Sequence, residues 1–141
     1  MTQPSPQPPQ PPQPPQPDAQ PIRSGSALVP AARRAGENVV AAVRGEIDLH
    51  NSPELRNVLL NTLLPDANPP KKLVLNLEQV PYMDSSAIAV LVESLRKVQR
   101  TGGKIYLTNL QPRVKGLLEI ARLNAIFVIV ATEDEALKKP L

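Results

Sequence analysis

The chain has 141 residues, enough for one ordinary domain and too few for two well-packed ones. It contains no cysteine and a single histidine, His50, which excludes disulfides and thiolate zinc sites and argues against any metal site. The formal net charge is +3, but the basic residues are spread along the chain, and three aromatic residues are too few for stacking on bases. We therefore expect no nucleic-acid partner.

The first part of the chain differs from the rest in composition. Eleven of the 18 prolines lie before residue 31, most of them in QPPQPPQPPQP at residues 7–17. Such a tract has no apolar side chains to bury and favours an extended, solvated backbone. We expect a disordered Pro/Gln-rich tail over residues 1–26 and one folded domain over residues 27–141. With neither an apolar run of membrane-spanning length nor an apolar signal segment, we also expect a soluble cytoplasmic protein without direct membrane insertion.

The folded part opens with the valine-rich run ENVVAAVRGEIDL at residues 37–49, which predicts a strand. Residues 27–34 could pair with it as a hairpin across Ala35 and Gly36. A helix is predicted to begin at Asn51 or Ser52 and to end at the PDANPP stretch, residues 65–70.

Residues 71–80, KKLVLNLEQV, are apolar on both faces of the predicted strand, which is typical of a central parallel strand covered by helices on both sides. A second helix begins after VPYMD and ends at Gly102 and Gly103. The remaining elements are a strand (KIYLTNL), a helix (QPRVKGLLEIARL), a strand (IFVIV) and a short terminal helix capped by Thr132. The order (β)β-α-β-α-β-α-β-α predicts an α/β fold with a mostly parallel sheet of four to five strands and about four helices.

In an open parallel sheet, the working site usually lies at the carboxyl ends of the strands. The polar residues expected there are Glu46, Asp48, Asn76, Asp84, Ser85, Ser86, Thr108 and Asn109. The six glycines fit neither the phosphate-loop nor the dinucleotide spacing, so we expect no nucleotide cofactor and indeed no cofactor at all. A serine hydrolase is also disfavoured, because the nucleophile elbow is missing and His50 falls in a loop. We predict no catalytic residues and no enzymatic activity.

The stretch MDSSA at residues 83–87 admits two interpretations. Asp84 or Ser85 could simply cap the second helix, which is an ordinary helix start. One side chain suffices for capping, however, and a hydroxyl at a helix N-terminus is a favourable place to carry a phosphate.

Three segments together resemble the STAS domain, and more closely the bacterial anti-sigma factor antagonists. They are VRGEIDLHNSPEL, LVLNLEQVPYMDSSA and TGGKIYLTNLQPRVKGLLEIARL, and the resemblance covers residues 27–137. It implies that Ser85, and less favourably Ser86, is phosphorylated by an anti-sigma factor serine kinase. The unphosphorylated chain would bind and sequester that kinase, and a phosphatase would reverse the modification.

The resemblance further implies that Asp48, Asn76 and Asp84 shape the surroundings of Ser85, and that Met83 and Ser86 contribute to partner binding. Ala87 stands where the family usually has glycine, and its methyl group would hinder close approach of a partner to the backbone. The alternative function is a constitutive STAS subunit of a signalling scaffold or of a phospholipid-transport assembly.

Overall fold

The computed structural model describes residues 19–140, which form a six-stranded sheet in the order β1-β2-β3-β4-β5-β6. The first three strands are antiparallel, and β3 to β6 run parallel to one another. The strands are β1 (Gln20–Pro21), β2 (Ala31–Ala35), β3 (Asn38–Arg44), β4 (Lys72–Gln79), β5 (Lys104–Thr108) and β6 (Val128–Val130).

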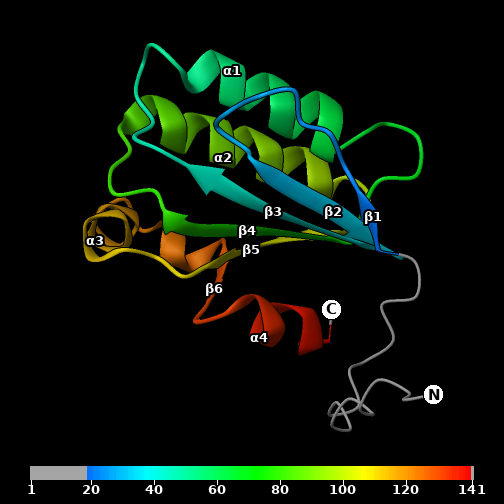
Figure 1. Ribbon diagram of the computed structural model, residues 1–141. Coiled ribbons are helices and arrows are strands. Elements are labelled where there is room, and N and C mark those ends of the chain that lie inside the picture. The colour runs from blue at the N-terminus through cyan, green and yellow to red at the C-terminus, as the bar shows by residue number, and fades with distance from the viewer. Residues whose placement is uncertain (1–18, 141) are drawn as a thin grey trace, which may run out of the picture.

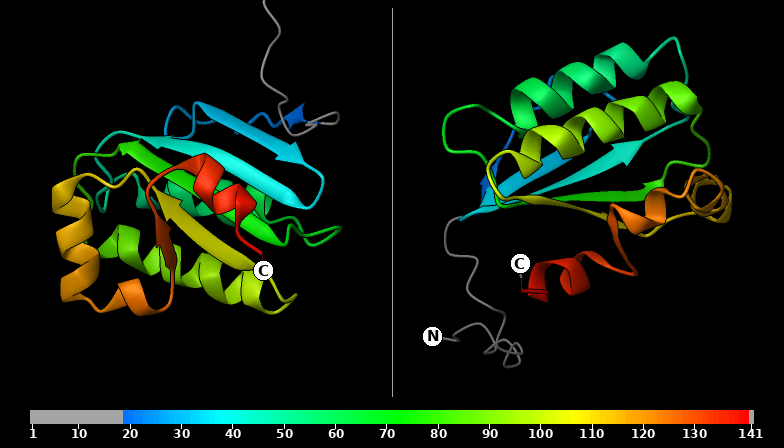
Figure 2. Two further views of the ribbon diagram at one scale, coloured as in Figure 1. Left: turned by 90° about the horizontal axis from the view of Figure 1, so that it is seen from below. Right: turned by 180° about the vertical axis from the view of Figure 1, so that it is seen from behind.

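Helices cover both faces of this sheet, as Figures 1 and 2 show. The helices α1 and α2 lie side by side on one face, α4 lies on the opposite face, and α3 stands at one end. The helical segments are α1 (Ser52–Asn57), the π-helix η1 (Val58–Leu63), α2 (Ser85–Gln99), α3 (Pro112–Ile120), the 3-10 turn η2 (Leu123–Ala125) and α4 (Glu133–Lys138). The predicted α/β class, element order and parallel sheet are confirmed.

Two details differ from the sequence prediction. The sheet has six strands rather than four or five, because Gln20–Pro21 pairs antiparallel with β2 within the range predicted as tail. Residues 1–18, which make up most of that predicted tail, lie outside the described residues. The first helix also changes from α to π geometry at Val58, for which the sequence carries no recognisable signal.

The predicted hairpin across Ala35 and Gly36 is confirmed, because β2 pairs antiparallel with β3 and Gly36 has a φ of +61°. Pro30 precedes β2, so its missing N–H costs no ladder hydrogen bond. No helix among residues 19–140 is both long and apolar enough to cross a bilayer.

The strand β4 is covered on both faces, as its continuous apolar run predicts. Leu73 and Leu75 belong to the main core beneath α1 and α2, whereas Val74 packs with Tyr106 and Ala136 on the α4 side. Alternation along the strand therefore assigns successive residues to opposite layers.

A buried lysine fastens α4 to the sheet. The Lys72 side-chain amine donates to the carbonyl oxygens of Ala136 (2.9 Å), Leu137 (3.1 Å) and Lys139, and lies 5.1 Å from the centre of the Tyr106 ring. These carbonyls lie in the last turn of α4 and at the residue just beyond it, where intrahelical donors are missing. Burial lowers the pKa of Lys72 below its usual value.

The turn between α2 and β5 is tight at Gly103. Its N–H donates to the Val98 carbonyl (2.9 Å), and Gly102 before it has the left-handed φ of +78° predicted for a helix cap. A Cβ added at Gly103 would lie 2.5 Å from Cγ2 of Val98 and 3.0 Å from the Lys71 carbonyl oxygen. The end of α2 thus approaches the start of β4 too closely for a side chain.

We expect Gly103→Ala to lower the free energy of unfolding by about 1–3 kcal/mol, because the new methyl group has to displace backbone as well as a side chain. Gly116→Ala in α3 is the matched control: nothing lies within 4 Å of its added Cβ, and alanine should favour the helix by about 0.5–1 kcal/mol. Urea unfolding measures both variants. Equal effects of the two substitutions would contradict this account of the turn.

Candidate functional site

Two loops at the carboxyl ends of β3 and β4 are joined by backbone hydrogen bonds. Ile47 and Met83 form a parallel bridge, in which the Ile47 N–H donates to the Tyr82 carbonyl (3.1 Å) and the Asp84 N–H donates to the Ile47 carbonyl (3.0 Å). The sheet thereby brings the loop that contains Asp48 beside the start of α2, where Asp84 lies. The sequence predicts this proximity of Asp48 and Asp84.

Asp84 is the N-cap of α2. Its Oδ1 accepts hydrogen bonds from the Ser86 N–H (2.9 Å), the Ala87 N–H (3.3 Å) and the Ser86 hydroxyl (2.5 Å). The Ser86 hydroxyl, and then the backbone N–H groups of Ala87, Ser86 and Leu49, lower the pKa of this carboxyl below its usual value. The carboxylate is therefore held ionised and oriented, and it satisfies N–H groups that the helix leaves open.

The two serines have different surroundings. Ser85, the first residue of α2, is exposed, and its hydroxyl has no hydrogen-bond partner among the described residues. Ser86 is half-buried, and its hydroxyl is already bonded to Asp84. The geometry distinguishes a free hydroxyl at Ser85 from an occupied one at Ser86, a distinction that the sequence leaves open.

Asp48 holds its own loop. Its Oδ1 accepts from the N–H of His50 (2.8 Å) and of Asn51 (3.3 Å), while its own N–H donates to Oδ1 of Asn51 (2.8 Å). The Asn51 side chain does not cap α1, because its Nδ2 donates back to the Glu46 carbonyl (2.8 Å). The Glu46 side chain is exposed, and the His50 side chain is 95% exposed, as expected for a surface histidine.

The prediction that Asn76 lies near Ser85 is wrong. Its Nδ2 donates to Glu133 of α4 (2.7 Å), and its Oδ1 accepts from the Glu78 N–H (2.9 Å). The side chain thus lies on the α4 face of the sheet, opposite the helices α1 and α2. Asn76 fastens α4 and does not shape the surroundings of Ser85.

Thr108 and Asn109 also lie away from Ser85. Thr108 is fully buried, and neither its hydroxyl nor Oδ1 of Asn109 has a hydrogen-bond partner within residues 19–140. Asn109 has a left-handed φ of +56° and lines a different hollow, together with Lys115 and Glu135. The prediction that these two residues flank the same site is not supported.

Met83 and Ala87 both point into the core. Met83 is 2% exposed, so it offers a partner almost no surface, although it forms part of the wall of a hollow beside Ser85. Ala87 is fully buried, and its methyl group packs inward rather than toward a partner. The expectation that this methyl group hinders approach to the backbone is therefore wrong, since a partner would not meet it.

Ser85 instead borders a hollow of about 530 Å³ between the start of α2 and α3. The guanidinium of Arg113 lies 4.9 Å from the centre of the Tyr82 ring in its wall, and Ile120 at its rim is 84% exposed. Leu49, 72% exposed, extends from the neighbouring loop. The residues that line the hollow are Tyr82, Met83, Asp84, Ser85, Arg113, Gly116, Leu117 and Ile120.

Sequence reasoning missed the contribution of α3 to this surface. Val114 and Leu118 of α3 are buried whereas Ile120 is exposed, and the sequence prediction of this helix did not separate the two kinds of position. Nothing local indicates that Arg113 reaches Tyr82, because the contact joins two separate elements.

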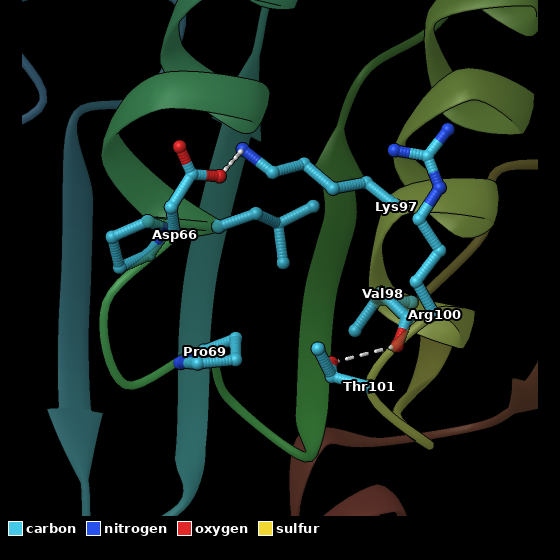
Figure 3. A pocket seen from close by; sticks show the side chains of 8 residues that line it. Asp66, Pro69, Lys97, Val98, Arg100 and Thr101 are labelled. Carbon is cyan, nitrogen blue, oxygen red and sulfur yellow. Dashed lines mark hydrogen bonds and ion pairs between the residues drawn. The ribbon is translucent and has the colours of Figure 1, made fainter.

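A second, smaller hollow lies at the other end of α2, as Figure 3 shows. Lys97 there pairs with Asp66 (3.2 Å) and donates to the Leu60 carbonyl (2.6 Å), and the Thr101 hydroxyl donates to the Val98 carbonyl (3.1 Å). These polar groups satisfy one another, which is typical of a structural junction. Within residues 19–140, no group of three or more histidines or carboxylates is arranged to hold a metal ion.

Comparison with known proteins identifies the class of this domain. The STAS domain family model matches residues 29–136, so the chain belongs to the STAS domain family. The anti-sigma-B factor antagonist of Bacillus subtilis is 35% identical over 92 residues, which are 65% of this chain and 81% of that protein. Within the family, the chain is thus related to the anti-sigma factor antagonists.

Solved structures share the fold. A Thermotoga maritima protein superposes with a TM-score of 0.72 at 22% identity, covering 79% of this chain and 93% of its own. The Bacillus cell fate determinant SpoIIAA in its phosphorylated form superposes with a TM-score of 0.56 at 24% identity, covering 72% and 89%.

The cap at Asp84 makes stability depend on pH in a defined direction. Because the folded state lowers the pKa of Asp84, its stabilising contribution is present above the unfolded-state pKa and is lost as the pH falls through the folded-state pKa. Asn at this position would still cap the helix, but without a charge. We expect the Tm advantage of the native chain over Asp84→Asn to be largest at neutral pH and to shrink in acid.

Thermal unfolding of both proteins across this pH range measures the difference, in which contributions of the other carboxylates cancel. A Tm difference that stays constant with pH would contradict the assigned role of the Asp84 charge.

Proposed function

We propose that this chain is an anti-sigma factor antagonist switched by phosphorylation of Ser85. The main support is the difference between the two serines. The Ser86 hydroxyl is hydrogen-bonded to Asp84, whereas Ser85 is exposed at the start of the helix. The relationship to the anti-sigma-B factor antagonist of Bacillus subtilis, and the fold shared with SpoIIAA, which has been solved phosphorylated, support this function.

The partner in this proposal is an anti-sigma factor serine kinase that the unphosphorylated chain binds and sequesters. A phosphatase restores the binding form, and the chain itself is a substrate and a binding module that catalyses nothing. The hollow beside Ser85, with Ile120 exposed in its wall and Leu49 exposed on the loop next to Asp84, is a suitable docking surface, because apolar side chains near the modified residue gain from burial against a partner.

A phosphate on Ser85 is compatible with the fold and incompatible with a close interface. It would sit at the N-terminal end of α2, where the helix dipole favours negative charge, and an exposed side chain has room for it. The partner would have to accept up to about two added negative charges, and repulsion and desolvation at an interface weaken binding strongly.

The acceptor can be tested by capturing the chain with its bound proteins from its host. Incubation with ATP should add the mass of one phosphate group, and peptide mass spectrometry should place it on Ser85. Ser85→Ala should abolish the modification, whereas Ser86→Ala should retain the acceptor hydroxyl and still be modified. Phosphate found on Ser86, or on neither serine, would refute the proposed acceptor.

A charged substitution should separate binding from folding. We expect Ser85→Asp to weaken binding of the kinase at least about tenfold, because one unfavourable charge at an interface commonly costs more than about 1.4 kcal/mol. The Tm should stay close to that of the native chain, since an acidic residue in the first turn suits the helix dipole. Calorimetric titration and thermal unfolding measure the two effects, with Ser85→Asn as the uncharged control.

Unfolding of Ser85→Asp would show that Ser85 serves structure instead. Recovery of membrane-transport subunits rather than a kinase in a pull-down would favour the constitutive STAS subunit over the switch.

A further inference from the structure

The wall of the hollow beside Ser85 includes an arginine, Arg113, that has no ion-pair partner within residues 19–140. Arg113, in the first turn of α3, lines the same hollow as Ser85 and Asp84 and is the one basic residue among the described residues of its wall. It is exposed and forms no ion pair within residues 19–140. Its guanidinium lies 4.9 Å from the centre of the Tyr82 ring.

This placement suits a phosphate. An arginine that stacks on an aromatic ring uses the face of the guanidinium, while its N–H groups point outward along the edge. The Tyr82 ring therefore restrains the position of the Arg113 guanidinium without consuming its donors. Guanidinium edges bind phosphate oxygens through two parallel hydrogen bonds.

We propose that Arg113 is the intramolecular partner of the phosphate on Ser85. When Ser85 carries a phosphate, the guanidinium over the Tyr82 ring donates its N–H groups to the phosphate oxygens across the hollow. The inference rests on the proposed function, because this ion pair exists only in the phosphorylated chain.

An ion pair with Arg113 would offset the repulsion between a phosphate on Ser85 and the Asp84 carboxylate. Asp84 lines the same hollow, so a phosphate on the adjacent residue places up to about two further negative charges near its carboxylate. The hydrogen bonds of Asp84 to Ser86 and Ala87 hold that carboxylate in place. Arg113 offsets the repulsion without disturbing the helix cap.

The ion pair also changes the surface that a partner meets. A phosphate drawn toward Arg113 would occupy the hollow between α2 and α3, in addition to making it more negative. Phosphorylation would then release the partner by filling a docking surface as well as by repulsion.

The test uses the full chain with phosphoserine incorporated at position 85 during translation, so that no kinase is needed. Phosphorus NMR tracks the second pKa of the phosphate, which lies near about 6 in a free phosphoserine. A neighbouring guanidinium favours the dianion and lowers this pKa. Arg113→Gln should therefore raise it by roughly 0.2–0.7 units, the shift expected for an exposed ion pair.

Lys115→Gln is the matched control, because Lys115 is also exposed on α3 and loses the same charge, but lines the separate hollow with Asn109 and Glu135. It should shift the phosphate pKa by less than half as much. The carboxylates of Glu46, Asp48 and Asp84 are unchanged in all variants. Equal shifts in both variants, or no shift in Arg113→Gln, would overturn the proposal.

The result of the NMR titration does not depend on whether a kinase modifies the chain. Failure of the kinase experiment with a positive NMR result would refute the proposed function and leave the phosphate site intact. Kinase modification of Ser85 without the NMR shift would support the function and refute the role of Arg113.

Discussion

The start of α2 depends on one carboxylate. Asp84 satisfies the N–H groups of Ser86 and Ala87, binds the Ser86 hydroxyl, and through its own N–H joins the helix to Ile47 in the neighbouring loop. Because that loop continues β3, the sheet sets the position of the helix start. The same contacts consume the Ser86 hydroxyl and leave the Ser85 hydroxyl free, so a single cap both begins the helix and gives two adjacent serines different surroundings.

The alternation of side chains along the strands distributes the other polar residues. Leu75 faces the α1 and α2 layer and Asn76 faces α4, although the two residues are adjacent in β4. Proximity to the carboxyl end of a strand is therefore not sufficient to join a site, because each position belongs to one layer only. Asn76 and the buried Lys72 instead hold α4 against the sheet from opposite ends of the helix.

Much of the fold could be predicted because its signals are local. The apolar run around Val74, the hairpin at Gly36 and the cap at Asp84 each depend on a few consecutive residues, and each has the predicted structure. The two-residue strand β1 and the π-helix η1 could not be predicted, since neither carries an apolar period of its own. Burial of Met83 and Ala87 was missed because a helix start shows no repeat that would distinguish its inner from its outer face.

The sequence by itself determined the order of most strands and helices, the parallel sheet and the place where α2 begins, because periodicity, glycine conformation and capping act over a few residues. Only the tertiary structure decided which serine hydroxyl remains free, which face Asn76 occupies, and that the Arg113 guanidinium lies over the Tyr82 ring beside Ser85. The last arrangement requires α3 to pack next to the start of α2. That neighbourhood results from the order of strands in the sheet, and no local pattern of residues encodes it.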